Sequence, residues 1–386
     1  MKILITNHAL DRRAGTELYV RDLALALKRN GHQPACYAPV LGAVADDIRA
    51  LGIPVSDRPD AGEPPDILHC HHHHAAALAC LARPETPAIY ICHGVKPWQE
   101  APLARFPNIR RYVAVDRPCR EFLVKQGIPD DRIDLVLNGV DLERFAYDRP
   151  AQEDPDRQKR ALLISNVAGP ADLQPFRDAC RANGMTLEFA GVAGTVMESP
   201  ETELPRYGLV FAKARAALEA MASGCAVILA DYGKTGVRIT TANFGDLRPA
   251  NFGFSVINDP PDVSALTQSI AEIDWADAAL VTVRVREIAG FDAIAGQYEK
   301  IYEQLDTPPM NEGPDLIDAA RNYFERVLPH LQERDALAGR LYREVSDRIE
   351  RDRRLAALIK RVRTDRTAWP ELLAAARHLD PSNSDL

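Results

Sequence analysis

Three charged side chains that lie close together in the sequence could bind a nucleotide. In FAKARAALEAMASGCAV, residues 211–227, Lys213 and Arg215 come shortly before a single carboxylate, Glu219. The apolar run GLVFA precedes them, which indicates a strand, a short loop and a helix that starts near Ala216. The amino end of a helix attracts phosphate, and each cation would add charge-assisted hydrogen bonds of about 1.5–3 kcal/mol. Glu219, one turn in, would repel phosphate but could accept hydrogen bonds from sugar hydroxyls. The spacing suits a nucleotide, although a solvent-facing helix beside a charged loop gives the same pattern.

Histidines form the second candidate site. HCHHHH occupies residues 69–74, and His93 follows the apolar run AIYIC and precedes a glycine. Histidine is a good zinc ligand, but neighbouring side chains of a strand point to opposite faces, and no Cys or His pair at ligand spacing completes a site. We therefore predict no metal site. We interpret the run as a strand end whose turn, His71 to His73, faces a cleft, and we place His93 at the carboxyl end of a parallel strand.

Three other short motifs are weaker candidates for a functional site. DPD at 154–156 lies in a polar linker, and GKTG at 233–236 lacks the first glycine of a phosphate loop at the Walker spacing. NIRR at 108–111 is a small basic patch, which is either a solvated loop or a surface for an anionic acceptor molecule.

Short apolar runs alternate with amphipathic stretches over residues 1–145. KILIT opens the chain like a buried parallel strand, and TELYVRDLALALKRNGH follows with apolar residues at helical spacing and Gly31 as its end. QPACYAP, DILHCH, AIYICHG and RYVAVD are typical of further strands, with helical stretches between them. This alternation predicts a parallel sheet with helices on both faces.

The rest of the chain divides at two polar stretches. Residues 146–160 are polar and without periodicity, so we interpret them as a linker. A second alternation of strands and helices fills 161–291, and 292–305 should form its closing helix. We therefore predict two doubly wound, Rossmann-like α/β domains with a ligand in the cleft between them, outside the carboxyl ends of the strands.

A different composition begins after a second linker at 306–315. Residues 316–386 are rich in Arg, Glu, Ala and Leu, and an amphipathic stripe repeats every four residues, at Leu337, Leu341, Val345 and Ile349. This predicts an α-helical extension. It is either a helical bundle or self-association segment, or a basic helix that lies on a membrane surface or a partner.

The bulk composition is that of ordinary soluble globular domains. The 386 residues suffice for two or three domains, and the net charge of −8 gives no sign of a nucleic-acid partner. Seven scattered cysteines, an odd number, indicate reduced, buried thiols. No segment approaches the roughly 18 apolar residues of a membrane span, and the first residues do not resemble a signal peptide. We therefore expect a cytoplasmic protein, with peripheral contact to the inner membrane face as an open alternative.

Several of these stretches resemble one family in the same order along the chain. LEAMASGCAVILAD is similar to the LEAMA-x-G segment of GT-B glycosyltransferases of the family 4 type, and AGTELYVRDLALALKRNGH resembles that family's first loop and helix. PDILHCHHHH, PAIYICHG and the run that ends in NGVDLERF resemble its next segments. The resemblance covers about residues 1–305, and its most specific parts are the NGVD and LEAMA segments.

The resemblance implies a retaining, metal-independent transferase without a cofactor. It would move a sugar from a nucleotide diphosphate sugar, with a UDP-type donor expected, to an unidentified glycan, lipid-linked, protein or small-molecule acceptor. It implies that Gly15 lets the backbone approach the donor phosphates and that Glu219 holds the ribose. From their places in the sequence we also expect Asn166, Lys213, Arg215 and Ala216 to bind the donor. His93, Lys213 and Arg215 would take part in catalysis. His71, His72 and His73 would line the acceptor side.

This sequence departs from the family's pattern in three places. The family's second Glu, eight residues before Glu219, is Phe211 here. The Arg and Lys that follow the first strand of the second domain are absent, and Asn166 stands in that region. The two lost phosphate cations would cost several kcal/mol unless Lys213 and Arg215 replace them. The second domain is also about one strand–helix unit shorter than the pattern between Gly184 and Tyr207.

Three functions follow from this pattern. The first is an active glycosyltransferase. The second is a catalytically degenerate protein that binds nucleotide sugars or serves as a scaffold, favoured by Phe211 and Asn166. The third is another reaction of the same fold, such as epimerisation of a nucleotide sugar, which would need a further acid/base group in the cleft.

Overall fold

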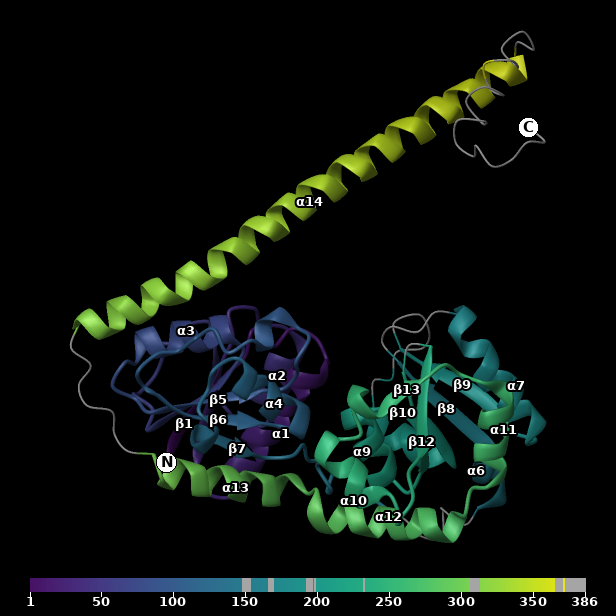
Figure 1. Ribbon diagram of the computed structural model, residues 1–386, viewed down its shortest axis with the longest axis horizontal. Coiled ribbons are helices and arrows are strands. Elements are labelled where there is room, and N and C mark those ends of the chain that lie inside the picture. Colours follow the sequence, from purple (N-terminus) through teal and green to yellow (C-terminus); the bar gives the residue numbers. More distant parts are fainter. Residues whose placement is uncertain are drawn as a thin grey trace. The chain divides into compact units, whose positions relative to one another are not determined.

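The computed structural model describes residues 1–147, 154–165, 170–191, 197, 199–231, 233–305, 313–364 and 371. They belong to two compact units, Met1–Ala320 and Arg321–Leu386. The first unit holds two α/β domains, each built around one sheet, as Figure 1 shows in purple to blue and in teal to green.

The first domain has an all-parallel, seven-stranded sheet in the order β3-β2-β1-β4-β5-β6-β7. Its strands are β1 Lys2–Thr6, β2 Gln33–Tyr37, β3 Val55–Ser56, β4 Ile67–His71, β5 Ala88–Cys92, β6 Ile109–Ala114 and β7 Ile133–Leu135. Its helices are α1 Gly15–Arg29, α2 Ala43–Ala50, α3 His73–Ala82 and α4 Arg117–Lys125. The strand order reverses between β1 and β4, and in such sheets ligands bind outside the carboxyl ends at that point.

The second domain has a six-stranded sheet in the order β13-β12-β11-β10-β8-β9. Its strands are β8 Arg160–Ile164, β9 Thr186–Ala190, β10 Leu209–Ala212, β11 Ala226–Asp231, β12 Lys234–Arg238 and β13 Ile257–Asp259. Its helices are α6 Pro155–Gln158, α7 Gln174–Ala182, α8 Pro200–Glu203, α9 Ala214–Ala222, α10 Phe244–Leu247, α11 Val263–Ala271 and α12 Trp275–Ile288.

The second sheet is mixed, whereas the sequence predicted a parallel one. Strands β8 to β11 pair in parallel, but β12 pairs antiparallel with β11, and β13 pairs antiparallel with β12. Only two residues separate β11 from β12. Such a connection is too short for a parallel crossover, so the chain must turn back on itself. Between Gly184 and Tyr207 the described residues form β9, the single turn α8 and a short 3₁₀ turn.

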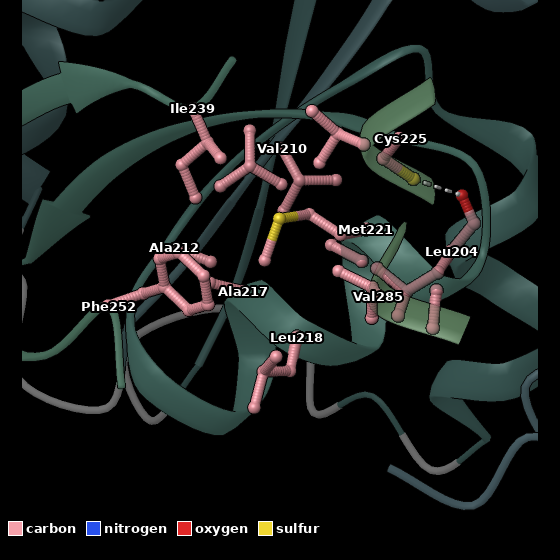
Figure 2. Packing of buried hydrophobic residues seen from close by; sticks show 14 of the residues in the cluster. Leu204, Val210, Ala212, Ala217, Leu218, Met221, Cys225, Ile239, Phe252 and Val285 are labelled. Atoms are coloured by element: carbon pink, nitrogen blue, oxygen red, sulfur yellow. Dashed lines mark hydrogen bonds between the residues drawn. The ribbon is translucent and has the colours of Figure 1, made fainter. Parts of the chain in front are cut away.

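The core of the second domain lies on both faces of its sheet. Along β10, Val210 and Ala212 pack into one cluster with α9 and α12, while Leu209 and Phe211 pack into another with α7 and α11. Figure 2 shows the first cluster, where Met221 of α9 lies among Val210, Val285 and their neighbours. This alternation fixes β10 in register, so Lys213, the next residue after the strand, lies at the carboxyl edge of the sheet.

A closing helix, α13 Phe291–Glu303, follows the second domain and packs on α1 of the first. The Tyr298 hydroxyl lies 2.8 Å from that of Tyr19, and the Asn30 amide donates to Glu299 at 2.7 Å. The sequence placed this helix at 292–305. The preceding α12 lacked a clear apolar stripe and was not predicted as a separate helix.

The two predicted linkers lie partly outside the described residues. Within 146–160, residues 148–153 are not described, while Pro155–Gln158 form α6 and Arg160 begins β8. Within 306–315, residues 306–312 are not described. The predicted helical extension is one continuous helix over its described part, α14 Gly313–Thr364, with Pro329 inside it.

Candidate functional site

Lys213 is the N-cap of α9 and lies where β10 and β11 end. Its Nζ is 2.7 Å from Oδ2 of Asp231, the last residue of β11, and 4.3 Å from the centre of the Phe254 ring. Ser165, just after β8, donates its hydroxyl hydrogen to the other oxygen of Asp231 at 2.7 Å. The cation is therefore held at the carboxyl edge of the second sheet, the edge at which doubly wound folds bind ligands.

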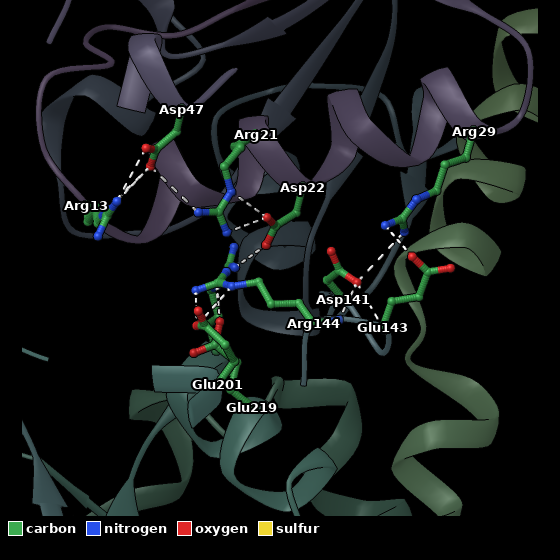
Figure 3. A network of polar contacts seen from close by, with 11 residues as sticks. Arg13, Arg21, Asp22, Arg29, Asp47, Asp141, Glu143, Arg144, Glu201 and Glu219 are labelled. Carbon is green, nitrogen blue, oxygen red and sulfur yellow. Dashed lines mark hydrogen bonds and ion pairs between the residues drawn. The ribbon is translucent and has the colours of Figure 1, made fainter. Parts of the chain in front are cut away.

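Arg215 joins the two domains. Its Nε donates to Glu219 Oε1 at 2.7 Å, and its Nη2 donates to Asp22 of α1, which also accepts from Arg21 at 2.6 Å. Figure 3 labels the two carboxylates of this network, Asp22 on α1 in purple and Glu219 on α9 in teal. Nη1 of Arg215 is buried and has no hydrogen-bond partner among the residues that the structure describes. Two carboxylates thus orient the guanidinium and leave one of its nitrogens for a ligand.

The charges of this network stabilise one another. Burial alone would disfavour the guanidinium, but Asp22 and Glu219 raise the pKa of Arg215. Burial likewise opposes the charge of Asp22, yet Arg215 and Arg21 hold the pKa of its carboxyl below the ordinary value. Arg215 therefore stays cationic at any pH at which the protein is folded.

Glu219 faces Arg215 in the folded protein. It is nearly buried, with 8% of its surface exposed, and it lies past the first turn of α9. At the start of this helix the Ala214 N–H donates to the Phe252 carbonyl and the Ala217 N–H to the Lys213 carbonyl. The N–H groups of Arg215 and Ala216 lie between them, where a phosphate would approach the helix end.

Gly15 begins α1, one helix end in the first domain. A methyl group at its Cα would meet no atom within 4 Å, so open space lies beside this backbone. Asp22, the acid that contacts Arg215, lies two turns further along the same helix. Helix α1 therefore brings an open backbone and a carboxylate to the side of the first domain that meets α9.

His93 follows β5 and contacts His71, the last residue of β4. Their facing atoms, Nε2 of His93 and Nδ1 of His71, are 2.6 Å apart, and the two rings stack with centres at 4.7 Å. The rings of Tyr19 of α1 and His93 pack in a T-shaped arrangement. Burial lowers the pKa of His93 to about 4, and it also lowers the pKa of His71 well below the ordinary value. Both imidazoles are therefore neutral near pH 7, so His93 can donate or accept a hydrogen bond but carries no charge.

The turn from His71 to His73 is buried rather than open to solvent. His71 and His73 have no exposed surface and His72 has 1%. Nε2 of His72 lies 3.3 Å from Glu100, while His73 packs against the ring of Trp98. His72 adopts a left-handed backbone with φ 59°, which lets α3 begin directly after β4. The strand end is as the sequence predicted, but these three side chains are packed inside the domain, and His71 contacts His93.

The sequence did not reveal Glu100 and Lys96. The carboxylate of Glu100 accepts the backbone N–H of His93 at 2.9 Å and also contacts His72, so it joins the ends of β4 and β5. Lys96, on the loop after His93, has its Nζ 5.3 Å from the Phe254 ring that Lys213 also approaches. One cation from each domain thus lies against a single half-exposed phenyl ring. The segment HGVK could have indicated Lys96, since this lysine follows the candidate histidine by three residues.

The remaining predicted residues lie elsewhere. Asn166 is outside the described residues. Phe211 is fully buried in the core, with its ring 5.1 Å from that of Phe176. Ile109, Arg110 and Arg111 of the NIRR patch form part of the lining of a cavity of about 590 Å³ at the amino end of β6, so the patch lies at the opposite edge of the sheet from His93. Within the described residues, no group of three or more His, Cys, Asp or Glu side chains is arranged to hold a metal ion.

A comparison with known families gives one match. Residues 13–144 match the sequence model of Glycosyltransferase Family 4. The matched segment includes α1 with Asp22, His93 with its neighbours, and the NGVD segment. No curated protein gives a significant match. In the part of the chain that the structure describes, no helix is long and apolar enough to cross a membrane.

Solved structures share the two-domain architecture. HepE from Anabaena, crystallised with UDP-glucose, is 14% identical with a TM-score of 0.59, and the alignment covers 79% of this chain and 100% of HepE. The catalytic domain of starch synthase IV from Arabidopsis thaliana, bound to ADP and acarbose, has 12% identity, a TM-score of 0.51 and coverage of 78% and 98%. UDP-GlcNAc 2-epimerase from Neisseria meningitidis, bound to UDP-GlcNAc, has 11% identity, a TM-score of 0.51 and coverage of 79% and 100%. At these identities the likeness concerns the fold. The chain therefore has the GT-B fold of these structures, and its residues 13–144 match the model of Glycosyltransferase Family 4.

Proposed function

We propose that this protein is a retaining glycosyltransferase that uses a nucleotide diphosphate sugar, with UDP as the nucleotide. The observation that supports this most is Arg215, which two carboxylates orient while its buried Nη1 has no partner among the described residues. A diphosphate oxygen is an acceptor of the right charge for that nitrogen. The likeness to HepE, which was crystallised with UDP-glucose, supports the choice of donor.

The donor would lie across the carboxyl edges of both sheets. Its diphosphate would accept hydrogen bonds from Arg215 and from the first N–H groups of α9, with Lys213 and Lys96 adding positive charge. Gly15 would let the backbone approach the phosphates. Glu219 would accept from the ribose hydroxyls, since Arg215 contacts Oε1 and a carboxylate has further lone pairs.

Catalysis would depend on stabilising the leaving group. As the bond from C1 of the sugar to the β-phosphate oxygen breaks, negative charge grows on the diphosphate, and the cations around it lower that barrier. The acceptor hydroxyl attacks C1 from the same face, and its proton passes to the departing phosphate oxygen. Neutral His93 would hold a sugar hydroxyl or the bound acceptor, while Glu100 fixes its backbone and buried His71 holds its ring. No metal ion enters this scheme.

The test begins with donor binding and turnover. UDP-glucose and its ADP and GDP counterparts are titrated by calorimetry, and nucleotide release is measured with and without candidate acceptors. Arg215→Ala should abolish most turnover while the far-ultraviolet circular dichroism stays unchanged. Arg12→Ala is the matched control, because that side chain is 79% exposed. Unchanged turnover in Arg215→Ala would exclude the proposed role of Arg215.

A second candidate is a binding or scaffolding protein that holds the nucleotide sugar without turning it over. The observation that favours it is that both cations of the 213–219 segment already pair with carboxylates, Lys213 with Asp231 and Arg215 with Asp22 and Glu219. Tight calorimetric binding without nucleotide release, under every acceptor tried, would select this candidate. Release of nucleotide would exclude it.

The proposal also covers where the acceptor binds and where in the cell the protein is located. We place the protein in the cytoplasm, with an acceptor that reaches the side of His93. Peripheral contact with the inner membrane face and self-association through α14 are both compatible with an amphipathic helix. Flotation of the protein with anionic vesicles tests the first, and the mass of the protein in solution tests the second.

A further inference from the structure

Helix α14 carries an exposed stripe with a seven-residue period. Leu331, Ala338, Val345 and Ile359 recur at multiples of seven, and Leu341 lies three residues after Ala338 on the same face. The leucines, the valine and the isoleucine are 40–56% exposed. Positions spaced alternately by three and four residues form the seam of a coiled coil, and most helical stability comes from packing such a face against a partner.

Three charged residues interrupt this seam. Asp352 occupies the column of Leu331 and Val345, while Arg334 and Arg348 occupy the column of Leu341. If two copies of the helix paired in parallel, each of these residues would face its own counterpart. Like charges would then meet three times in the core of the coil, which disfavours that arrangement.

An antiparallel pair centred on residue 343 places the same residues favourably. In that register each column of one helix faces the other column of its partner. Leu341 then meets Val345 of the second copy, the small Ala338 meets the long Arg348, and Arg334 meets Asp352. By symmetry every pair occurs twice. A shift by one heptad would instead set Asp352 against Leu341 in one direction and Arg334 against Val345 in the other. Charge therefore selects both orientation and register.

The other faces of the helix favour a protein partner over a lipid surface. Between residues 331 and 359 there are seven arginines and six carboxylates. Helices that lie on membranes have a polar face dominated by Lys and Arg, whereas mixed charge is typical of the solvent faces of coiled coils. The segment extends over about 43 Å at 1.5 Å per residue, the length of four heptads.

We propose that residues 331–359 of α14 bind the same segment of a second copy of this chain as an antiparallel coiled coil centred on residue 343. This proposal is independent of the reaction proposed above. It assigns the helical extension to dimerisation.

The first test is the mass of the full chain in solution. Sedimentation equilibrium should give twice the monomer mass of 42.6 kDa. Val345→Asp should dissociate the dimer, whereas Ser346→Asp, which adds the same charge on the outward face one residue later, should leave it intact. Circular dichroism verifies that the helix persists in both variants. A monomeric native chain, or equal effects of the two variants, would overturn the proposal.

The second test concerns orientation and register. Arg334→Asp and Asp352→Arg should each weaken the dimer at least tenfold, and the double variant should restore it because the charge pair is only reversed. When chains with Ala338→Cys and chains with Arg348→Cys are mixed and oxidised, the antiparallel register predicts the mixed disulfide. A disulfide that forms only between two chains that both carry Ala338→Cys would show a parallel pair and exclude this arrangement. Vesicle flotation of a monomeric chain would assign the stripe to a membrane instead.

Discussion

At the scale of single residues, Arg215 lies where the two α/β domains meet. It lies on the second domain, but Asp22 of the first domain competes for it with any ligand in the cleft. The two carboxylates that contact Arg215 also keep it charged. A residue that binds phosphate and a residue that only ties two domains together would look alike in this structure, and substitution of Asp22 separates the two roles.

If Arg215 binds the donor, removal of its competitor should not harm binding. Arg215→Gln should weaken donor affinity by about tenfold or more, because a charge-assisted hydrogen bond contributes about 1.5–3 kcal/mol. Asp22→Asn keeps the shape of the side chain but removes its negative charge, so it holds Nη2 less strongly, and donor affinity should stay equal or rise. Calorimetry with UDP-glucose measures both. Equal losses of thermal stability in the two variants, with no change in affinity, would show that the contact is only structural.

Phe211 gives a second prediction at this scale. The glycosyltransferases that this segment resembles have a glutamate there, but this side chain is fully buried against Phe176. Phe211→Glu should therefore not improve transfer. It should destabilise the fold by at least the roughly 3–5 kcal/mol of a large-to-small core change, since an unpaired carboxylate enters the core. Phe211→Leu should cost much less. Urea unfolding measures both, and a stable Phe211→Glu chain with raised turnover would contradict this view.

Sequence reasoning identified some residues of the site and missed their partners for a physical reason. Lys213, Arg215 and His93 were found because each directly follows an apolar strand or starts a helix. Their partners Asp22 and Phe254 are far away in the sequence, and tertiary packing alone brings them close. The sequence therefore presented Arg215 as a free cation, whereas the structure shows it in an ionic network.

At the scale of elements, the NGVD segment has a structural task that its place in the family does not reveal. Val140 forms a parallel bridge to Gly290, with its N–H donating to Ala289 at 2.7 Å and its carbonyl accepting from Phe291 at 3.0 Å. The segment thus fixes the end of α12 and the start of α13. Because α13 crosses back to α1, this bridge helps to hold the two domains together.

Gly139 should tolerate no side chain at this bridge. A methyl group there would lie 2.8 Å from Ile294 Cγ1 and 3.1 Å from the Ala289 carbonyl oxygen. Gly139→Ala should cost about 1–3 kcal/mol of unfolding free energy, the usual range for overpacking. Gly15→Ala is the control, since open space lies beside Gly15. This substitution should leave stability nearly unchanged, but it should weaken donor binding because the methyl group obstructs the donor phosphates. Chemical denaturation and calorimetry check the pair, and equal stabilities would refute the steric argument.

Elements were predicted best where periodicity was strong. The parallel strands of the first domain and α1 were recognised because short apolar runs and a helical stripe are unambiguous there. The hairpin of β11 and β12 was missed because KTGVR is polar and half-exposed, with no apolar alternation to mark a strand. In α12, alternating valines from Val281 to Val285 concealed the helical period. The extension was recognised as helical. Because a proline usually interrupts a helix, the sequence did not show that one helix continues through Pro329.

At the scale of the whole molecule, buried histidines connect the ends of β4 and β5 with the closing helix α13. The same histidines determine how stability responds to pH. His69 and His71 lie inside the first domain, and the Nδ1 of His69 contacts the Tyr302 hydroxyl of α13 at 2.6 Å. Burial lowers the pKa of His69 to about 3, and lowers those of His8 and His93 to about 4. These groups remain neutral in the folded chain well below the pH at which the unfolded chain protonates them.

The protein should therefore lose stability as the pH falls from about 6.5. In that window the unfolded chain binds protons at these histidines and the folded chain does not, so each fully buried one costs up to about 1.4 kcal/mol per pH unit. The loss continues until the pH reaches the lowered pKa values near 4 and 3. The pKa values of Asp22 and Glu100 are lowered despite burial, so these two groups extend the loss of stability to lower pH. Burial raises the pKa of Glu17, so that group opposes the loss.

Urea unfolding at pH 7.5, 6.5, 5.5 and 5.0 measures this slope. His69→Gln should reduce it by up to one proton, because it removes one group that titrates only in the unfolded state. His330→Gln is the matched control, since that side chain is exposed on α14. A free energy of unfolding that stays flat from pH 6.5 to 5.0, or an equal change of slope in both variants, would show that the histidines are not held neutral. The expected result would show that acid destabilises the packing of the buried histidines near His93. It would also show that acid weakens the contact between the first domain and α13.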